Sequence, residues 1–461
     1  MAEIAPFRGL RYDLKKAGAL EQVFAPPYDV IDNALREKLI ARSEYNIARV
    51  SRSPEADREP EPQRYAAAAR LLADWRKSGA LVEDPAGAFY AYEEEFRVSG
   101  RTCKRLGLVV GLRLVDFGQG VHPHEETLSG PKADRRLLLE KTRTHLGQIF
   151  GLYPDEPGAV NAAVRKATGS RQPDQEARDD EGVVHRMWAI SAKGACDGLV
   201  RLLADKDIFI ADGHHRYEVA LKYSREHPEL PRAKYVMATL VALSDPGLVV
   251  LPTHRLAHDL PDFSLARLET ALAENFRLQQ FPFKAEDRDS RLAALVARLA
   301  EQGRAGKNSF GLYGGGDHFT LLTLENPRAM QAAEPAHGEA WRGLDVAVLH
   351  SLILERLLGI DKAKLAARSN LDYLKDTGAA IKEAIARIDT AVAGCRLPVA
   401  GDTENRQPTT ENGDQAQCVL IMNPTGVGQV AAVASGGEKM PQKSTFFHPK
   451  IFTGLVMMPL E

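Results

Sequence analysis

The chain has 461 residues, and its 60 lysines and arginines nearly balance 62 aspartates and glutamates, for a formal net charge of -2. Hydrophobic residues make up 44% and charged residues 26%. This mixture is typical of globular proteins and excludes wholesale disorder, collagen and coiled coil. The chain lacks the excess of basic residues that is typical of proteins that bind nucleic-acid phosphates. At about 150 residues per domain, the length predicts roughly three domains or one elaborated fold.

The cysteines and the apolar runs narrow the class of protein further. The four cysteines are far apart, form no CxxC pair and give no basis for a disulfide framework or a Cys-based zinc site. The first residues lack the pattern of a secretory signal. No apolar run approaches the ~20 residues that span a bilayer. We therefore expect a soluble, cytoplasmic protein.

The first 150 residues predict a loop-rich opening followed by regular elements. Residues 1–60 look irregular, with the two prolines of APPYDVI favouring extended or turning backbone. An amphipathic helix is expected over 63–79, ending at Gly79. Residues 86–116 alternate as a β-hairpin with its turn at Gly100. Helix signals follow Ser129 and Pro131, with leucines recurring from Leu137 to Leu146.

The middle of the chain alternates between short strands and helices. A helix and an exposed loop are expected over 155–180, a strand over His185–Ile190 and a helix over 191–206. The next segment changes period: Asp207–Ala211 reads as a strand, Asp212–Arg216 as a turn and Tyr217–His227 as a helix. A buried strand is expected over Tyr235–Leu243. Residues 251–260 run from a strand end into a helix-rich stretch.

The last 200 residues predict an inserted lobe and a C-terminal part. Residues 263–330 suggest an α/β insert with a helix at 287–303 and a hairpin around the glycines at 314–316. An apolar helix is expected over 343–358, mixed strand and helix over 363–394, and an exposed hairpin loop over 401–417. We therefore predict an α/β or α+β fold with a mixed sheet, divided into the ranges 1–120, 121–262, 263–340 and 341–461.

The strongest local signal for chemistry is ADGHHRYE. A strand that ends in Asp212 and Gly213 and opens a helix presents an N-terminus that attracts phosphate. Gly213 permits close backbone approach, and Arg216 offers a guanidinium suited to phosphate. Asp212 could hold Mg²⁺, and His214 and His215 could donate hydrogen bonds or protons. The alternative is an Asp cap with solvent-exposed histidines.

A second segment, HPHEETLSGPKADRR, joins acids to a basic cluster. Glu125 and Glu126 could act as a base, and Lys132, Arg135 and Arg136 surround an expected helix start. Phosphoryl-transfer sites typically contain carboxylates beside cationic side chains. The alternatives are a solvated helix end, or a zinc site with His122 and His124, although that spacing matches no common zinc pattern.

Two further segments supply candidate anion ligands. MPQKSTFFHPK would form an anion-binding loop, with a charged chain terminus as the alternative. THR follows an apolar run, so two of its side chains could face the same cleft, with a surface turn as the alternative. Weaker candidates are Tyr28, Asp29, Asn46 and Arg49. The residues in question are Lys443, Ser444, Thr445, His448 and Lys450 in the first segment and His254 and Arg255 in the second.

Together these segments resemble a bacterial and archaeal family known as domain of unknown function 1015. The resemblance rests on APPYDVI, the HPHEET and ADGHHR segments, LPTHRL, LDVAVLHSLILERLLGI and the run from NPTGVG to HPKIFTGL. ADGHHR is also similar to the signature of the ParB/sulfiredoxin-like superfamily, which includes a free-serine kinase. This implies a ParB/sulfiredoxin-like core in which Asp212, Gly213, His214 and Arg216 contact the phosphoryl donor and its Mg²⁺.

The resemblance implies a Mg²⁺-dependent kinase for free L-serine, or its reverse on phosphoserine. Pyrophosphate is the implied donor, with ADP or ATP as alternatives. The absence of both GxxxxGK[ST] and GxGxxG in the sequence fits a donor without a nucleoside. Gly213 stands where sulfiredoxin chemistry needs a cysteine, which disfavours that activity.

Two rival functions remain open from the sequence. A phosphatase or other metallohydrolase would use His122, His124, His214 and His215 as metal ligands. A ParB-like module that senses nucleotide and contacts DNA would need a helix-turn-helix and a basic face, and neither is clear. We expect a small-molecule substrate, with no membrane partner, no nucleic acid, and an oligomer as an open question.

Overall fold

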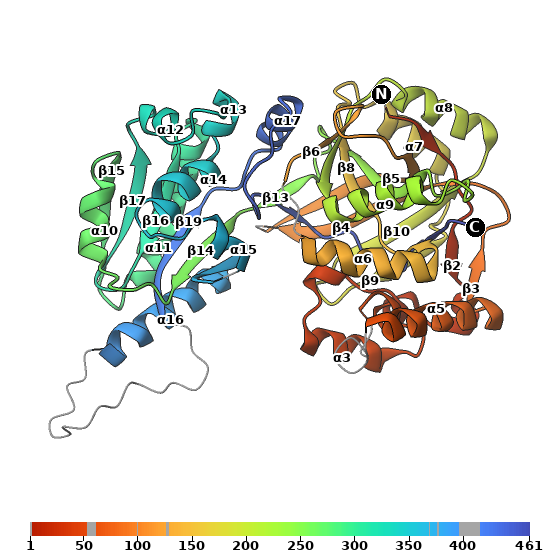
Figure 1. Cartoon of the computed structure of the whole chain (residues 1–461), viewed down its shortest axis with the longest axis horizontal. Coiled ribbons are helices and arrows are strands. Elements are labelled where there is room, and N and C mark those ends of the chain that lie inside the picture. Colours follow the sequence, from red (N-terminus) through yellow and green to blue (C-terminus); the bar gives the residue numbers. More distant parts are fainter. Residues whose placement is uncertain are drawn as a thin grey trace. The chain divides into compact units, whose positions relative to one another are not determined.

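A computed structural model describes residues 2–52, 61–98, 100–125, 129–367, 369–375, 378–395 and 415–461. The described chain forms two compact units (Figure 1). Unit 1 contains Met1–Val249 and Phe447–Glu461, and unit 2 contains Val250–Phe446. The chain passes between the units at β13 (Val249–Leu251) and β20 (Phe446–His448). The expected ranges 1–120 and most of 121–262 fall in unit 1, and 263–340 and most of 341–461 fall in unit 2.

Within the described residues, unit 1 is built on a nine-stranded mixed sheet. Its strand order is β6-β11-β8-β12-β5-β4-β10-β9, with β1 paired to β5. The pairs β6–β11 and β8–β12 are parallel, and the other neighbours are antiparallel. The strands are β1 Ile4–Ala5, β4 Phe89–Val98, β5 Arg101–Arg113, β6 Val121–Pro123, β8 Ile149–Tyr153, β9 Gln175–Arg178, β10 Val184–Ile190, β11 Ile208–Asp212 and β12 Tyr235–Ala242.

Helices and short strand pairs complete unit 1. The short strands are β2 Leu10–Tyr12 with β3 Leu81–Glu83, and β7 Thr144–His145 with β21 Met458–Pro459. The helices are α1 Leu14–Ala17, α2 Leu20–Val23, α3 Asn33–Arg42, α4 Ala48–Ser51, α5 Glu61–Ser78, α6 Ser129–Thr142, α7 Ala159–Thr168, α8 Lys193–Leu203 and α9 His214–Glu226, with a 3-10 turn at Tyr28–Val30.

Unit 2 is a six-stranded sheet whose two faces both carry apolar side chains. Its order is β15-β17-β16-β19-β14-β18. Leu256 and Ala257 are successive residues of β14 and lie in different core clusters, because neighbouring side chains of a strand point to opposite faces. The strands are β14 Thr253–His258, β15 Phe276–Pro282, β16 Ser309–Tyr313, β17 His318–Leu324, β18 Leu371–Lys375 and β19 Ala416–Met422.

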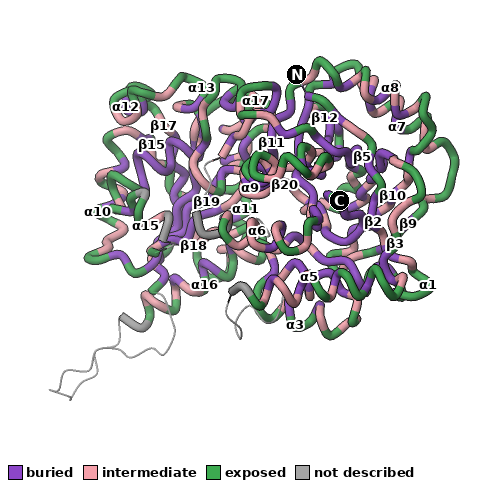
Figure 2. The backbone as a smooth tube through the Cα atoms, turned by 45° about the vertical axis from the view of Figure 1, so that its right-hand side comes forward, coloured by how far each residue is buried: buried purple, intermediate pink, exposed green. Residues whose placement is uncertain are grey.

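The helices of unit 2 cover these apolar faces. They are α10 Leu265–Leu272, α11 Arg288–Arg304, α12 Arg328–Ala333, α13 Glu339–Arg342, α14 Asp345–Val348, α15 Lys362–Ala367, α16 Gly378–Cys395 and α17 Val427–Ser435, with a π-helix at Leu349–Glu355. Figure 2 shows buried residues concentrated on the strands, as in β5 and β12 of unit 1 and β19 of unit 2.

The sequence predicted most long elements, and the mixed α/β class is confirmed. The predictions for β4–β5, α8, β12, α11 and the β16–β17 hairpin match the structure. The loop-rich opening was wrong, because it contains α1 to α4; three of these have four residues each, too short for a periodic pattern. The 155–180 region also contains strand β9, and the apolar helix at 343–358 is split into α14 and a π-helix. The predicted loop at 401–417 lies almost entirely outside the described residues.

Candidate functional site

The turn between β11 and α9 gathers charged side chains at a strand end. β11 ends at Asp212, and α9 begins at His214, three residues earlier than expected. Gly213 joins them with φ 91°, a left-handed conformation that favours glycine. A Cβ at Gly213 would lie 3.0 Å from Nε and Nη2 of Arg216. Glycine therefore allows both the turn and the return of the Arg216 side chain over it.

Asp212 is a half-buried carboxylate held between two cations. Its Oδ2 accepts a hydrogen bond from Lys450 Nζ at 2.9 Å, and its Oδ1 lies 4.0 Å from Arg216 Nη2. Burial alone would raise the pKa of Asp212, but the charges of Lys450 and Arg216 hold it well below its usual value. The carboxylate is therefore ionised at neutral pH. The predicted association of Asp212, Gly213, Arg216 and Lys450 is present within unit 1.

Two buried histidines lie beside this turn. The backbone N–H of His124 donates to Nε2 of His214 at 3.2 Å, and the two rings are 4.7 Å apart. Nδ1 of His124 donates to the carbonyl of Ile210. Burial lowers the pKa of His124 to about 4, although the Ile210 carbonyl and the Asp212 charge act in the other direction. His124 is thus neutral at pH 7, and His214, as an acceptor at Nε2, carries its proton on Nδ1 when neutral.

His215 lies among charges from α6 and from the end of the β6 segment. Burial and the charge of Lys132 lower the pKa of His215, whereas Glu125 and Glu218 act to raise it. Lys132 forms an ion pair with Glu218, which joins α6 to α9. The second predicted base, Glu126, lies outside the described residues. Glu125 is the candidate base whose place beside His215 the structure describes.

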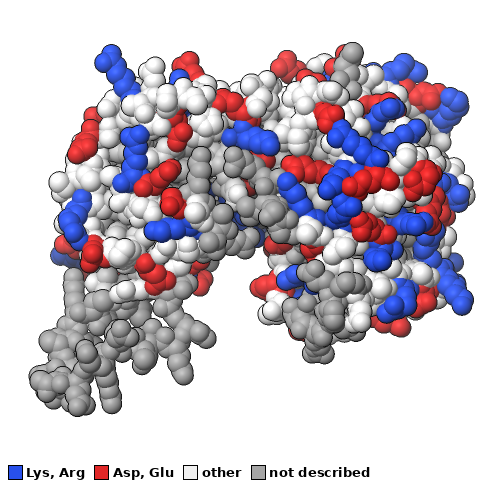
Figure 3. All heavy atoms as spheres, in the orientation of Figure 1, with Lys and Arg blue, Asp and Glu red and all other residues white. Residues whose placement is uncertain are grey.

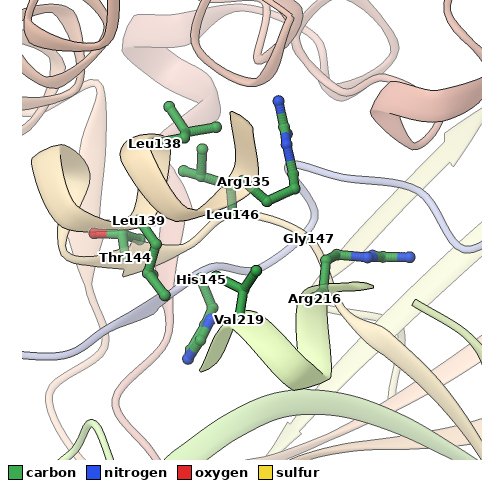
Figure 4. Close-up of a pocket in the computed structure, with 9 residues that line it drawn as sticks. All are labelled: Arg135, Leu138, Leu139, Thr144, His145, Leu146, Gly147, Arg216 and Val219. Atoms are coloured by element: carbon green, nitrogen blue, oxygen red, sulfur yellow. The ribbon is translucent and has the colours of Figure 1, made fainter. Parts of the chain in front are cut away.

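Arg135 and Arg216 line a small pocket between α6 and α9 (Figure 4). Its volume is about 60 Å³. The guanidinium of Arg135 lies over the ring of Tyr28, 3.8 Å from its centroid, and donates to Asp134 at 2.6 Å. The remaining lining residues are Leu138, Leu139, Thr144, His145, Leu146, Gly147 and Val219. The pocket thus joins two cations to mostly apolar walls.

Arg136 does not join this group. It pairs with Glu140 at 2.8 Å and with Glu226 at 2.8 Å. Glu226 is the last residue of α9, so the pair lies about 18 Å along the helix from His214. Figure 3 shows such cationic and anionic side chains interspersed over the visible face of unit 1. The described contacts of Arg136 are those of a surface ion pair that fastens α6 to α9.

The other predicted anion ligands belong to unit 2. His254 and Arg255 follow strand β13, as expected, but they lie inside the next strand, β14, and both are buried. His254 Nδ1 accepts from the backbone N–H of Met422 at 3.0 Å, and Arg255 Nη2 donates to the carbonyl of Lys443 at 3.1 Å. The carbonyl of Ser444 accepts from Thr425 at 2.8 Å. The structure thus brings the two segments together. The role of His254, Arg255, Lys443, Ser444 and Thr445 as phosphate ligands stays a prediction.

Sequence reasoning missed several residues that hold the site. The carbonyl of buried Gln148 accepts from Arg216, and no sequence signal marks a backbone acceptor. Glu94 and Arg105 form a buried ion pair. Arg105 also donates a hydrogen bond to the carbonyl of Pro449, the residue before Lys450. Here a signal existed: with a period of two, Glu94 shares a face of β4 with Tyr90, Tyr92 and Phe96, and so points inward.

The four-histidine metal site of the metallohydrolase alternative does not form. His122 is 3.4 Å from Asp207, and it stacks on Phe209 rather than on the other histidines. Over the described parts of the chain, no group of three or more histidine, cysteine, aspartate or glutamate side chains is arranged to hold a metal ion. At the turn, Asp212 by itself provides one carboxylate as a possible metal ligand.

None of the described helices combines the length and the apolar character needed to cross a bilayer.

The chain matches one known protein family in sequence and is distantly similar to several solved structures. A family model described as "Protein of unknown function (DUF1015)" matches residues 4–347. No curated protein is similar enough in sequence to match the chain. Among solved structures, a mutant free serine kinase in complex with ADP is 11% identical, with a TM-score of 0.33 over 73% of this chain and 88% of that chain. A conserved hypothetical protein from Pyrococcus furiosus is 13% identical, with a TM-score of 0.30 over 72% and 89% of the two chains. SbnI with a C-terminal truncation, from Staphylococcus aureus, is 10% identical, with a TM-score of 0.30 over 74% and 84%.

Proposed function

We propose that this chain, which belongs to the family described as Protein of unknown function (DUF1015), is a phosphotransferase that phosphorylates free L-serine or runs in reverse on phosphoserine. One observation supports the class of reaction. Asp212 is an ionised, half-buried carboxylate placed 2.9 Å from Lys450 Nζ and 4.0 Å from Arg216 Nη2, at the N-terminus of a 13-residue helix. Phosphoryl transfer needs little covalent chemistry from a protein and much charge stabilisation and positioning.

The cations and the helix end are suited to the transferring group. Lys450 and Arg216 lie on either side of Asp212, so a phosphate beside this carboxylate would meet both. Gly213, the cap residue of α9, has no side chain that could cap the first N–H groups of the helix. Helix N-termini favour anions through their backbone N–H groups and their dipole. Developing negative charge on the phosphoryl oxygens would be stabilised by these groups.

Pyrophosphate is our proposed donor, ahead of ADP or ATP. Arg216, which lies beside Asp212, also lines the pocket that Arg135 borders, so a further cation is available for a second phosphate group. The sequence also lacks the phosphate-loop and dinucleotide signatures that nucleotide sites often carry. A donor made only of phosphate groups fits these features.

Asp212 fits Mg²⁺ as one ligand of a site that the donor completes. Mg²⁺ is usually bound through one or two carboxylates, waters and substrate phosphates, without a full protein cage. The ionised Asp212 supplies such a carboxylate, and its oxygens have lone pairs beyond the one that Lys450 engages. When bound, Mg²⁺ would neutralise charge on the phosphates.

The acceptor hydroxyl needs a base, and we assign this role to Glu125. Its charge acts on His215, in the first turn of α9, so it lies near the proposed phosphate site. In the forward direction the serine oxygen bonds to phosphorus, the bridging P–O bond of pyrophosphate breaks, and the hydroxyl proton passes to the carboxylate. Glu126 is the alternative base. Free L-serine is the acceptor that the sequence resemblance implies.

The decisive experiment measures phosphoserine formed from L-serine and MgCl₂ with pyrophosphate, ADP or ATP. We expect turnover with pyrophosphate and its loss in Asp212→Asn, because the amide removes the charge that Lys450, Arg216 and Mg²⁺ require. Phosphate released at the same rate with and without serine would show a hydrolase instead. No turnover with any donor, from folded protein, would contradict the proposal.

A further inference from the structure

Lys450 is carried by a C-terminal segment that returns into the core of unit 1. Phe447 packs on Phe150, with ring centroids 5.4 Å apart, and Phe452 packs on Phe24 at 4.8 Å. Between these two aromatic contacts, Lys450 Nζ reaches Asp212. The position of the ammonium group therefore depends on how the backbone between Phe447 and Phe452 is held.

A buried ion pair lies against this segment. Glu94 of β4 and Arg105 of β5 are register partners in the antiparallel pair. Their side chains are 1% and 0% exposed. Arg105 Nε and Nη2 both donate to Glu94 Oε2, at 2.8 and 2.5 Å. Removing two charges from water is costly, and the attraction between them often only offsets this cost. Stability alone therefore gives a weak reason for the pair.

The same guanidinium also holds the backbone that precedes Lys450. Arg105 Nη1 donates to the carbonyl of His448 at 3.3 Å, and Nη2 donates to the carbonyl of Pro449 at 2.6 Å. A guanidinium has five donors in a rigid plane, so it can fix two carbonyls and a carboxylate in one geometry. A lysine in the same place is a point charge on a flexible stem and cannot.

Glu94 is itself held from the other side. Tyr92 Oη donates to Glu94 Oε1 at 3.2 Å and lies 2.7 Å from His185 Nδ1. His185 Nε2 is 3.2 Å from Asp179 Oδ2. Buried polar networks with satisfied partners restrict their members to one arrangement. The network therefore runs from Asp179 across β10, β4 and β5 to the backbone beside Lys450.

We propose that Arg105, fixed by Glu94, is the positioning residue for Lys450, and that the pair sets where the ammonium group meets the anion bound at Asp212. This inference rests on the proposed function for the role of the anion. Arg105 does not touch the substrate in this account. It acts through the carbonyls of His448 and Pro449, which determine the course of the chain into Lys450.

A double-mutant cycle separates positioning from general destabilisation. Binding of inorganic pyrophosphate with MgCl₂ would be measured by calorimetry on the full chain and on Arg105→Lys, Lys450→Met and the double variant. We expect Arg105→Lys to weaken binding by tenfold or more when Lys450 is present, and by less than twofold when it is Met. An equal loss in both backgrounds would overturn the inference. Arg113→Lys, at the exposed end of β5, where Arg113 pairs with Glu3 at 2.9 Å, is the matched control and should leave binding unchanged.

Hydrogen exchange tests the same inference without any ligand. Arg105→Lys should speed exchange of the amides at 450–453 relative to those of β5, and unchanged exchange there would overturn the inference even if pyrophosphate binds. Wild-type protein that fails to bind pyrophosphate while this exchange difference is present would contradict the proposed function alone. If Arg105→Lys does not fold, Glu94→Leu with Arg105→Met replaces the pair by apolar side chains of similar size, and the same exchange difference is expected.

Discussion

Each unit carries candidate anion-binding residues on a strand, but these residues make different contacts in the two units. In unit 1, the chain leaves β11 at Asp212, turns through Gly213 and starts a helix, so Asp212 and Arg216 lie side by side and meet Lys450. In unit 2, His254 and Arg255 are the second and third residues of β14, which is paired on one side to β18 and on the other to β19. Their contacts include the backbone groups of Met422 and Lys443.

The difference shows that residue type alone does not decide chemistry. A strand end followed by a helix N-terminus gathers side chains and a dipole at one point. A central strand spreads successive side chains onto opposite faces, where the core surrounds them. The unit 1 turn is therefore expected to carry activity, and the described contacts of His254 and Arg255 are expected to contribute to stability.

The largest effect is expected from Asp212→Asn. It removes a half-buried charge that organises Lys450 and Arg216, so transfer from pyrophosphate to serine should fall by about 100-fold or more, as for loss of other preorganised electrostatic groups. The assay is steady-state phosphoserine formation. Asp116→Asn is the matched control, because Asp116 pairs with Arg225 at the surface of the same unit. A comparable loss of activity in both variants would mean that Asp212 matters no more for transfer than a carboxylate at the surface.

Acid should destabilise both units through buried histidines. Burial lowers the pKa of His124 and His145 to about 4 in unit 1, and burial with the charge of Arg255 lowers that of His350 to about 3 in unit 2. Below about pH 6.5 the unfolded chain takes up protons that the folded chain refuses, so stability is full above that pH and is lost as the pH falls towards 4. The full loss of stability is on the order of 3 kcal/mol for His124 and for His145, and on the order of 5 kcal/mol for His350.

Urea unfolding at several pH values measures this dependence. His350 Nε2 has no hydrogen-bond partner within the described structure, so His350→Leu should fold. The variant should show a slope of unfolding free energy against pH that is smaller by up to one proton between pH 4 and 6.5. An unchanged slope would mean that His350 is protonated in the folded protein.

His254→Ala tests the expectation for unit 2. The substitution leaves the buried N–H of Met422 without its acceptor, which costs about 1–3 kcal/mol. We expect a lower free energy of unfolding and pyrophosphate binding close to that of the wild type. If the folded variant instead loses binding without losing stability, His254 is a phosphate ligand as the sequence suggested, and the contrast between the two strands disappears.

Gly213→Ala has a matched partner in unit 2. Both Gly213 and Gly306 have positive φ, 91° and 72°, so a Cβ costs about 1–2 kcal/mol of stability at either position. Only at Gly213 would the new Cβ meet the guanidinium of Arg216, whereas nothing lies within 4 Å at Gly306. Thermal unfolding should therefore report similar losses, and calorimetry should report weaker pyrophosphate binding for Gly213→Ala alone. Equal binding in the two variants would show that Arg216 does not depend on the turn.

The sequence predicted this turn because its signals are local. A buried strand, Asp212-Gly213 and a helical period lie within 20 residues, and the structure differs mainly in starting α9 at His214. Lys450 was also singled out, but its contact with Asp212 spans 238 residues and no local pattern indicates it. The carbonyl of Gln148 and the ring of Tyr28 beside Arg135 depend on the same long-range packing.

The smallest effect is expected from Arg136→Gln. This variant tests whether a residue that is adjacent to the site in sequence also belongs to it in the fold. The sequence grouped Arg136 with Arg135 because they are adjacent, but successive residues of a helix do not face each other. Arg136 is 34% exposed and pairs with Glu140 and Glu226 near the end of α9. Such pairs contribute about 0–1 kcal/mol. Pyrophosphate binding should stay within twofold of the wild type and the free energy of unfolding should fall slightly, whereas a large loss of binding would return Arg136 to the site.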